Sequence, residues 1–228
     1  CCRKKTGGAV VSRGEILVLS SIISSIKDVL VWLPAIIIAL TFHEYAHGRV
    51  AYWLGDKTAY YAGRLTLNPL PHIDWIGFLM LVFLRFGWAK PVPVNPVNLR
   101  KTSMKTGMLL VSVAGPLMNM LLALSGMIML RLALNYLTGE TAYLLVQLLV
   151  PFIYINLVLA IFNLVPVPPL DGSKILAGIL PDSWGTLVYR YGNYGYALLL
   201  LLVFTGLIGK VIGPLIQSAY QLLYALVF

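Results

Sequence analysis

Long apolar stretches alternate with short polar segments along most of the chain. A helix needs about 20 predominantly apolar residues to cross a hydrocarbon core of roughly 30 Å. Five stretches reach this length, at residues 34–54, 106–134, 142–165, 191–208 and 211–228. Two more, at residues 16–26 and 76–88, are too short to be assigned as spans by length alone. The pattern predicts an all-α polytopic membrane protein with about six transmembrane helices.

The composition supports this class. The chain of 228 residues is 59% hydrophobic and 11% charged, and its mean hydropathy of +0.85 exceeds that of soluble domains. A net charge of +9 could suit nucleic acid. The basic residues, however, are scattered in short loops between apolar stretches, where the positive-inside rule accounts for them. We therefore expect the lipid bilayer, and no nucleic acid, as a partner.

The charges of the loops also predict an orientation. Residues 89–105 carry basic side chains and no acid, whereas residues 135–141 carry Glu140 as their one charge. The first loop is therefore expected in the cytoplasm and the second outside, with residues 166–190 inside again.

The basic segment at residues 1–15 is expected to be a disordered or processed terminus on the cytoplasmic side. That location requires the region around residues 16–33 to cross the membrane as well. Residues 16–228 are expected to form a single domain, because no long polar segment divides them.

One span contains an unusual group of polar residues, the sequence HEYAH at 43–47. Ionisable side chains in a span are tolerated mainly where they face a cavity, a partner or a metal. His43 and His47 are four residues apart and share one face of a helix, where both imidazoles can bind one zinc ion. Glu44 lies beside the first ligand and can act as the general base for zinc-activated water. The chain has three histidines in all, so two of them in this pattern argue against chance.

A catalytic zinc site usually takes three protein ligands, so one more is needed. Among the acids outside this motif, Asp171 alone follows a span closely within an irregular segment, NLVPVPPLDGSKIL. Its prolines stop the helix and Gly172 permits a tight turn, and such backbone at membrane depth is tolerated where it lines a cavity. Asp171 is therefore the candidate third ligand, with N-capping of a following short helix as its alternative role. His72 is expected to be a satisfied loop histidine.

With both segments in hand, the chain resembles the site-2 proteases, the intramembrane zinc metalloproteases of family M50. The resemblance rests on HEYAH at 43–47 and on NLVPVPPLDG at 163–172. Weaker support comes from AGPLMN at 114–119, GRLTLNPLPHID at 63–74 and GWAKPVPVNP at 87–96, which resemble the compact prokaryotic branch. No stretch is long and polar enough for a PDZ or CBS domain, and Trp75 stands where this branch commonly has proline.

The resemblance implies that His43, His47 and Asp171 hold Zn²⁺ and that Glu44 activates water. It also implies that Asn163 helps to hold the substrate carbonyl or its oxyanion, although an interhelical hydrogen bond fits Asn163 equally well. A β-hairpin-like edge is implied at residues 63–70, within a small membrane-associated β element near 60–72. An extended substrate could add to such an edge.

The predicted function is therefore hydrolysis of peptide bonds in or near the transmembrane segment of single-span membrane proteins. The expected location is a prokaryotic cell membrane, with the active site towards the cytoplasm and either a homodimer or a regulatory membrane protein as a further partner. A metal transporter and a catalytically silent metal-binding scaffold are the alternatives. A transporter should offer ligands along a path through the membrane, whereas these cluster at one depth, and a silent scaffold should show a damaged motif.

Overall fold

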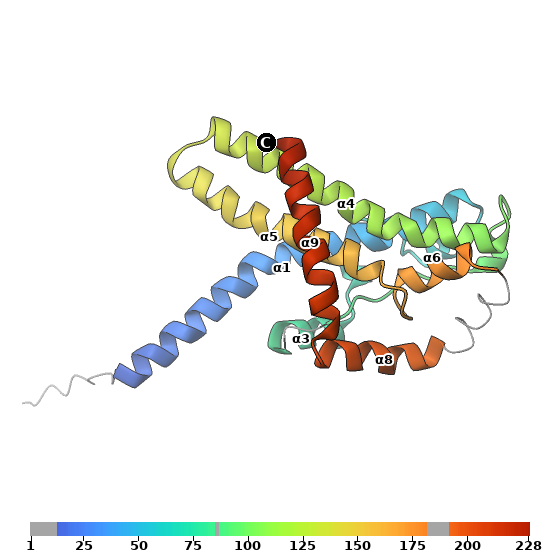
Figure 1. Ribbon diagram of the computed structural model, residues 1–228, viewed down its shortest axis with the longest axis horizontal. Coiled ribbons are helices and arrows are strands. Elements are labelled where there is room, and N and C mark those ends of the chain that lie inside the picture. The colour runs from blue at the N-terminus through green and yellow to red at the C-terminus, as the bar shows by residue number, and fades with distance from the viewer. Residues whose placement is uncertain (1–12, 85–86, 182–191) are drawn as a thin grey trace, which may run out of the picture.

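The computed structural model describes residues 13–84, 87–181 and 192–228, and helices joined by short loops make up most of these ranges (Figure 1). The long helices are α1 (Arg13–Trp53), α4 (Met104–Tyr136), α5 (Gly139–Asn163) and α9 (Leu207–Val227). The shorter ones are α2 (Thr58–Tyr61), α3 (Trp75–Leu84), α6 (Asp171–Ile179) and α8 (Gly192–Phe204), with single 3₁₀ turns at Leu70–His72 and Pro96–Asn98. Most of the predicted 1–15 segment lies outside the described residues.

Helix α1 corrects one prediction about the topology. Two separate crossings were expected at residues 16–33 and 34–54, but these residues lie in one uninterrupted helix of 41 residues. The segment between them, IKDVLVWLP, contains none of the paired turn residues, such as Asn-Gly, Asp-Gly or Pro-Gly, that mark a tight reversal of the chain. Pro34 lies inside the helix, and a single proline is tolerated in apolar helices of this kind.

Helices α4 and α5 form an antiparallel pair, joined by a tight connection at Gly139, whose φ of 66° suits glycine. Helix α9 crosses this pair (Figure 1). The largest apolar core lies between these three helices and includes Met127 of α4, Ile153 of α5 and Ile216 of α9. A Cβ at Gly126 would lie 2.9 Å from Ile153, so a small residue allows α4 and α5 to pack closely.

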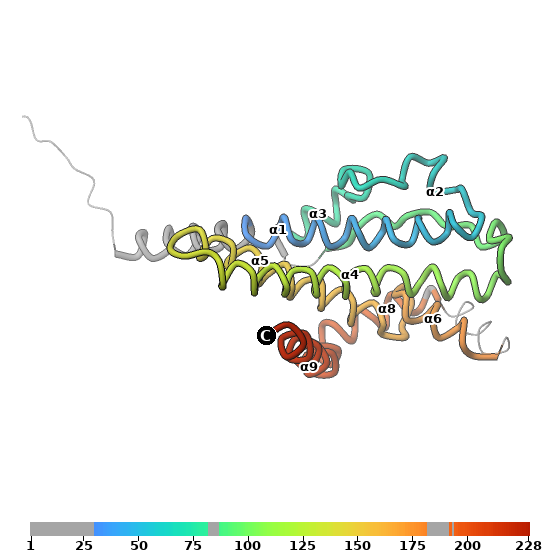
Figure 2. The backbone as a smooth tube through the Cα atoms, turned by 90° about the horizontal axis from the view of Figure 1, so that it is seen from above, coloured from blue at the N-terminus to red at the C-terminus, as the bar shows by residue number. Residues whose placement is uncertain are grey.

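The helices are arranged in layers, as the view from above shows (Figure 2). Helices α2 and α3 lie on one side of α1, and α6, α8 and α9 lie on the opposite side of α4. Helix α4 contacts α1, α5 and α6. Helix α4, from the middle of the sequence, thus lies between α1, near the start of the sequence, and α6, nearer its end.

Three described helices are long and apolar enough to cross a membrane: Leu30–Trp53, Met104–Tyr136 and Gly139–Asn163. A fourth crossing is counted only if Tyr194–Phe204 and Leu207–Val227, which meet at 76°, form one broken span. The predicted spans at 106–134 and 142–165 correspond to α4 and α5. The expected total of about six spans is not confirmed. The last two predicted spans form the bent pair, and α3 has only 10 residues, too few for a crossing.

The β-hairpin element expected near residues 60–72 is not confirmed. No β-strand occurs among the described residues, and the nearest pairing is an isolated bridge between Ile73 and Ala89. The side chain of Asn68 accepts a hydrogen bond from the Leu70 amide, and prolines on either side of Leu70 lack the amide hydrogens that a strand pair needs. Local side-chain bonds therefore replace a β ladder in this segment.

Candidate metal centre

His43 and His47 lie one turn apart on α1 and face α4. Both are buried, with 4% and 8% of their surface exposed, and their Nε2 atoms are 3.0 Å apart. A Cβ at Gly115 of α4 would lie 2.5 Å from each ring. Glycine at this position therefore lets the α4 backbone approach the two imidazoles closely.

Asp171 reaches the histidines from the first residue of α6. Its Oδ2 atom lies 3.2 Å from Nε2 of His43 and 3.0 Å from Nε2 of His47. Its Oδ1 atom lies 3.4 Å from Nζ of Lys174. The N-cap of α6 is Leu170, without a side-chain capping bond, so the alternative N-cap role of Asp171 is not observed. A Cβ at Gly172 would lie 2.3 Å from the Leu164 carbonyl, so glycine there lets α6 begin against the end of α5.

A chain of hydrogen bonds determines which His43 nitrogen carries hydrogen. The amide nitrogen of Asn119 donates to the Ala39 carbonyl at 3.1 Å and to Oδ1 of Asn156 at 2.8 Å. Asn156 is itself oriented, because its amide nitrogen donates to the Phe152 carbonyl at 2.8 Å. Oδ1 of Asn119 must therefore accept from Nδ1–H of His43, 2.6 Å away.

His47 is oriented in the same way, since its Nδ1 lies 2.7 Å from the Val111 carbonyl, which can only accept. Each neutral imidazole carries one hydrogen, so both Nε2 atoms present a lone pair. These lone pairs face each other and the Asp171 carboxylate. Outer hydrogen bonds of this kind typically orient metal-binding histidines.

The three acceptors repel one another unless a cation lies between them. The donor atoms of His43, His47 and Asp171 lie within 4.8 Å of one another, and they form the one group within the described ranges that could hold a metal ion. Ligand atoms about 2.0–2.1 Å from a tetrahedral zinc ion are about 3.3 Å apart. The observed separations of 3.0 to 3.2 Å match that arrangement. The donor set therefore fits zinc.

A cavity of about 280 Å³ lies beside this cluster and is lined by Glu44, Asn163 and Lys174, among others. Oε2 of Glu44 accepts a hydrogen bond from the Val92 amide at 2.8 Å. Asn163 is present at the cavity, but its amide nitrogen donates to the Leu159 carbonyl of its own helix at 3.0 Å. The interhelical bond considered for Asn163 is thus not made within the described part of the chain.

His72 lies outside the cluster, but it is not the fully satisfied histidine that was expected, because its buried Nδ1 has no hydrogen-bond partner within the described residues. It is buried, with 2% of its surface exposed, and its Nε2 lies 2.9 Å from the Thr66 carbonyl. The sequence alone did not reveal the partners of the candidate ligands. Asn119 and Asn156 are fully buried polar residues within apolar spans, and that mismatch was the available signal.

The fold and the site define a helical membrane metalloprotein in which a two-histidine, one-carboxylate cluster lies beside a glutamate. The chain belongs to Peptidase family M50, whose sequence model matches residues 31–205. It is accordingly a zinc metalloprotease of the site-2 type.

The relatives found are consistent with this assignment. The chain is 38% identical to "Putative zinc metalloprotease YwhC" of Bacillus subtilis over 186 residues, 80% of this chain and 84% of that protein. It is 31% identical to "Putative zinc metalloprotease Rip2" of Mycobacterium tuberculosis over 61% of this chain and 53% of that protein. It is 29% identical to "Zinc metalloprotease MJ0392" of Methanocaldococcus jannaschii over 57% of this chain and 37% of that protein. No solved structure matches significantly.

Proposed function

We propose that this protein hydrolyses peptide bonds in or near the transmembrane segment of single-span membrane proteins, with His43, His47 and Asp171 as its zinc ligands. The observation that carries the ligand assignment is the convergence of three lone-pair donors, 3.0 to 3.2 Å apart, in a buried site. Family membership supports peptide as the substrate.

Zinc, when bound, supplies a Lewis acid that polarises a carbonyl and makes water a nucleophile at neutral pH. The protein's part is to hold the ligands rigidly. Asn119 and the Val111 carbonyl orient the two imidazoles, and Lys174 lies near the Asp171 oxygen that does not face them. Burial excludes bulk water and strengthens these electrostatic interactions.

Glu44 is the general base. It takes a proton from the attacking water and passes it to the leaving amine when the peptide C–N bond breaks. The Val92 amide holds Oε2 of Glu44. Two hydrogen bonds at Lys90 position the extended segment that carries Val92. The Lys90 carbonyl accepts from the Arg64 side chain at 2.8 Å, and the Lys90 amide donates to the His72 carbonyl at 2.9 Å.

Asn163 is proposed to donate a hydrogen bond to the substrate carbonyl as negative charge develops on its oxygen. Its place in the cavity lining supports this role. To do so, the amide must exchange its bond to the Leu159 carbonyl for one to the substrate. A substrate helix must also unwind near the cleaved bond, because its own hydrogen bonds otherwise shield the backbone.

The proposed location is a prokaryotic cell membrane, with the site towards the cytoplasmic side. His47 lies six residues before the end of α1, or about 9 Å along the helix axis. The basic residues Arg100, Lys101 and Lys105 follow shortly after the segment that carries Val92. The positive-inside rule places such residues in the cytoplasm.

The test combines zinc content with cleavage of single-span substrates by the purified protein. Glu44→Gln should retain about one zinc per chain but lose about 10²- to 10⁴-fold in kcat, the usual contribution of a general base. Asp171→Ala should lose both zinc and cleavage, because two histidines alone do not complete the site. Glu140→Gln, at an exposed acid in the first turn of α5, serves as the matched control and should change neither property.

Two results would contradict the proposal. Full zinc retention in Asp171→Ala would remove Asp171 from the ligand set. Zinc binding by the wild type without cleavage of any substrate in the panel would favour the metal-binding scaffold over the intramembrane protease.

A further inference from the structure

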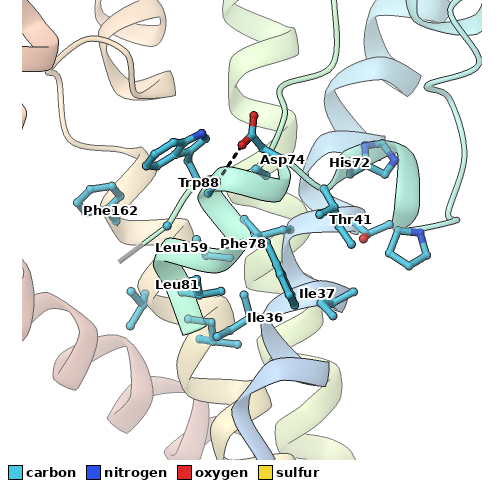
Figure 3. A pocket seen from close by; sticks show the side chains of 18 residues that line it. Ile36, Ile37, Thr41, His72, Asp74, Phe78, Leu81, Trp88, Leu159 and Phe162 are labelled. Carbon is cyan, nitrogen blue, oxygen red and sulfur yellow. Dashed lines mark hydrogen bonds between the residues drawn. The ribbon is translucent and has the colours of Figure 1, made fainter. Parts of the chain in front are cut away.

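A second cavity, of about 260 Å³, lies between α1, α3 and α5 and is largely apolar. Figure 3 shows its side chains converging from these three helices and from the two loops beside them. The lining includes Ile37 of α1, Phe78 of α3 and Leu159 of α5, with His72 and Asp74 from one loop. The volume is smaller than the roughly 300–1,000 Å³ of sites that hold whole small molecules. It suits a single large side chain.

The α1 wall of this cavity leads directly to the general base. Ile36, Ile37, Leu40 and Thr41 line the cavity, and their spacing places them on one face of the helix. The next position on that face is Glu44, four residues after Leu40, which lines the metal-site cavity. Leu40 and Glu44, which line one cavity each, are about 6 Å apart along the axis of α1.

On α5, too, residues four positions apart on one helix face line the two cavities. Leu159 and Phe162 line the apolar cavity, and Asn163, four residues after Leu159, lines the metal-site cavity. An extended peptide advances about 3.3 Å per residue, so its side chains on one face recur every 7 Å or so. This repeat is close to the rise of about 6 Å between Leu40 and Glu44 and between Leu159 and Asn163, the like-facing positions that line one cavity each.

We propose that the apolar cavity is a specificity subsite that takes one large apolar side chain of the unwound substrate, close to the cleaved bond. This inference rests on the proposed function, because it assumes that the scissile carbonyl lies beside His43, His47 and Asp171. The substrate class is thereby narrowed to transmembrane segments with a bulky apolar residue within about two positions of the cut. Glu44 and Asn163 lie one helical turn beyond lining residues of this cavity, on α1 and α5 respectively, and this closeness to the reacting groups favours a peptide side chain over a lipid chain as the occupant.

The experiment measures kcat/KM for a set of single-span substrates that carry Ala, Val, Leu or Phe at each of four positions on either side of the cleaved bond. The wild type should prefer the larger residues at one position. Ile37→Phe fills the cavity and should reverse that preference, with a change of about 10- to 200-fold in the Phe-to-Ala ratio. Phe78→Ala enlarges the cavity and should shift the preference towards Phe.

The neighbouring residue supplies a matched control. Ile38 is 41% exposed and does not line the cavity, so Ile38→Phe should leave the preference unchanged. A uniform loss of kcat/KM across all substrates in Ile37→Phe, without a change of preference, would overturn the subsite and would fit a lipid or structural role. If the wild type cleaves none of the substrates, the proposed function itself fails, which is a different result.

A separate observation concerns Ser112 on α4. Its side chain lines the metal-site cavity and only 1% of the residue is exposed. Its Oγ atom has no hydrogen-bond partner within the described parts of the chain. Such a group is costly to bury unless it acquires a partner. Ser112 follows Val111, whose carbonyl orients His47.

We propose that the Ser112 hydroxyl positions the substrate by a hydrogen bond to its main chain near the cleaved bond. Ser112→Ala removes an unpartnered buried hydroxyl, so thermal stability should stay equal or rise. Zinc content should not change, whereas kcat/KM should fall about tenfold, the value of one hydrogen bond of about 1.4 kcal/mol. Ser125 of the same helix is exposed and bonds the Leu122 carbonyl, so Ser125→Ala should leave kcat/KM unchanged.

The combination of unchanged or higher stability with lower kcat/KM distinguishes positioning from a structural role. A lower melting temperature with unchanged kcat/KM in Ser112→Ala would overturn the proposal. Unchanged kcat/KM with unchanged stability would overturn it too.

Discussion

Asp56 and Asp171 are both buried carboxylates, and their surroundings are opposite. Asp56, just after α1, accepts hydrogen bonds from the amides of Thr58 and Asn95 at 3.0 and 2.7 Å and from the Asn98 side chain at 3.2 Å. Oδ2 of Asp171 faces two imidazole nitrogens that, in their neutral form with the hydrogen on Nδ1, have none to offer it, and the one donor near this carboxylate is Lys174, 3.4 Å from Oδ1. The Asp56 cluster is complete within the protein, whereas the Asp171 cluster requires a cation.

This difference helps in reading buried polar groups. A carboxylate surrounded by donors stabilises the local fold, and removing it should affect stability alone. A carboxylate oxygen that faces acceptors indicates a ligand, because the protein would otherwise bury uncompensated repulsion. Disturbing its neighbours should therefore affect metal binding first. Three variants test this distinction.

The largest effect is expected at Gly115. A methyl group there would lie 2.5 Å from the rings of His43 and His47, so Gly115→Ala should displace both candidate ligands and abolish stoichiometric zinc binding and cleavage. Metal analysis of the purified protein is the measurement. Gly209→Ala is the control, because a Cβ at Gly209 meets nothing within 4 Å. Normal zinc content in Gly115→Ala would contradict the close approach of α4 to the site.

A smaller effect is expected at Asn119, which contacts His43 rather than the proposed metal position. Asn119→Leu keeps a similar volume but removes the bond that holds the His43 ring. Zinc affinity should fall about 10- to 100-fold, as for other outer partners of metal ligands. Competition with a chelator measures this value. Asn135→Leu, at an exposed position of the same helix, should leave the affinity unchanged.

The smallest effect on the metal, and a clear one on stability, is expected at Asp56. Burial raises the pKa of its carboxyl, but hydrogen bonds from Thr58, Asn95 and Asn98 outweigh burial and hold this pKa below its ordinary value of 3.8. A carboxyl whose pKa is lowered in the folded state stabilises the fold at pH values above its ordinary pKa. That contribution is lost as the pH falls through the folded-state pKa.

Asp56→Asn should therefore unfold more easily at neutral pH, by about 1–3 kcal/mol, while zinc affinity stays unchanged. The difference from the wild type should shrink as the pH falls below about 3.8. Thermal unfolding in detergent over a series of pH values measures it. A difference that grew on acidification, or a loss of zinc at neutral pH, would contradict the assignment of Asp56 to a purely structural cluster.

Local signals in the sequence predicted much of the site. The four-residue spacing of His43 and His47 requires one helix face whatever the fold, and the prolines before Asp171 interrupt a helix wherever they occur. The apolar stretches of α4 and α5 were predicted for the same reason. The β element near residues 60–72 was not confirmed, because it depended on resemblance and the local bonds of Asn68 and His72 prevail there.

The sequence by itself determined that the protein is helical and apolar, that it belongs among zinc metalloproteases, and which residues are candidate ligands. These properties depend on residue type and on short spacings along one helix. Only the tertiary structure decided that Asp171 faces both histidines, that Asn119 orients His43, that the Val92 amide binds Glu44, and that an apolar cavity lies one turn of α1 from Glu44. Those contacts join segments up to 128 residues apart, and their formation depends on how α4 packs between α1 and α6, which no local pattern encodes.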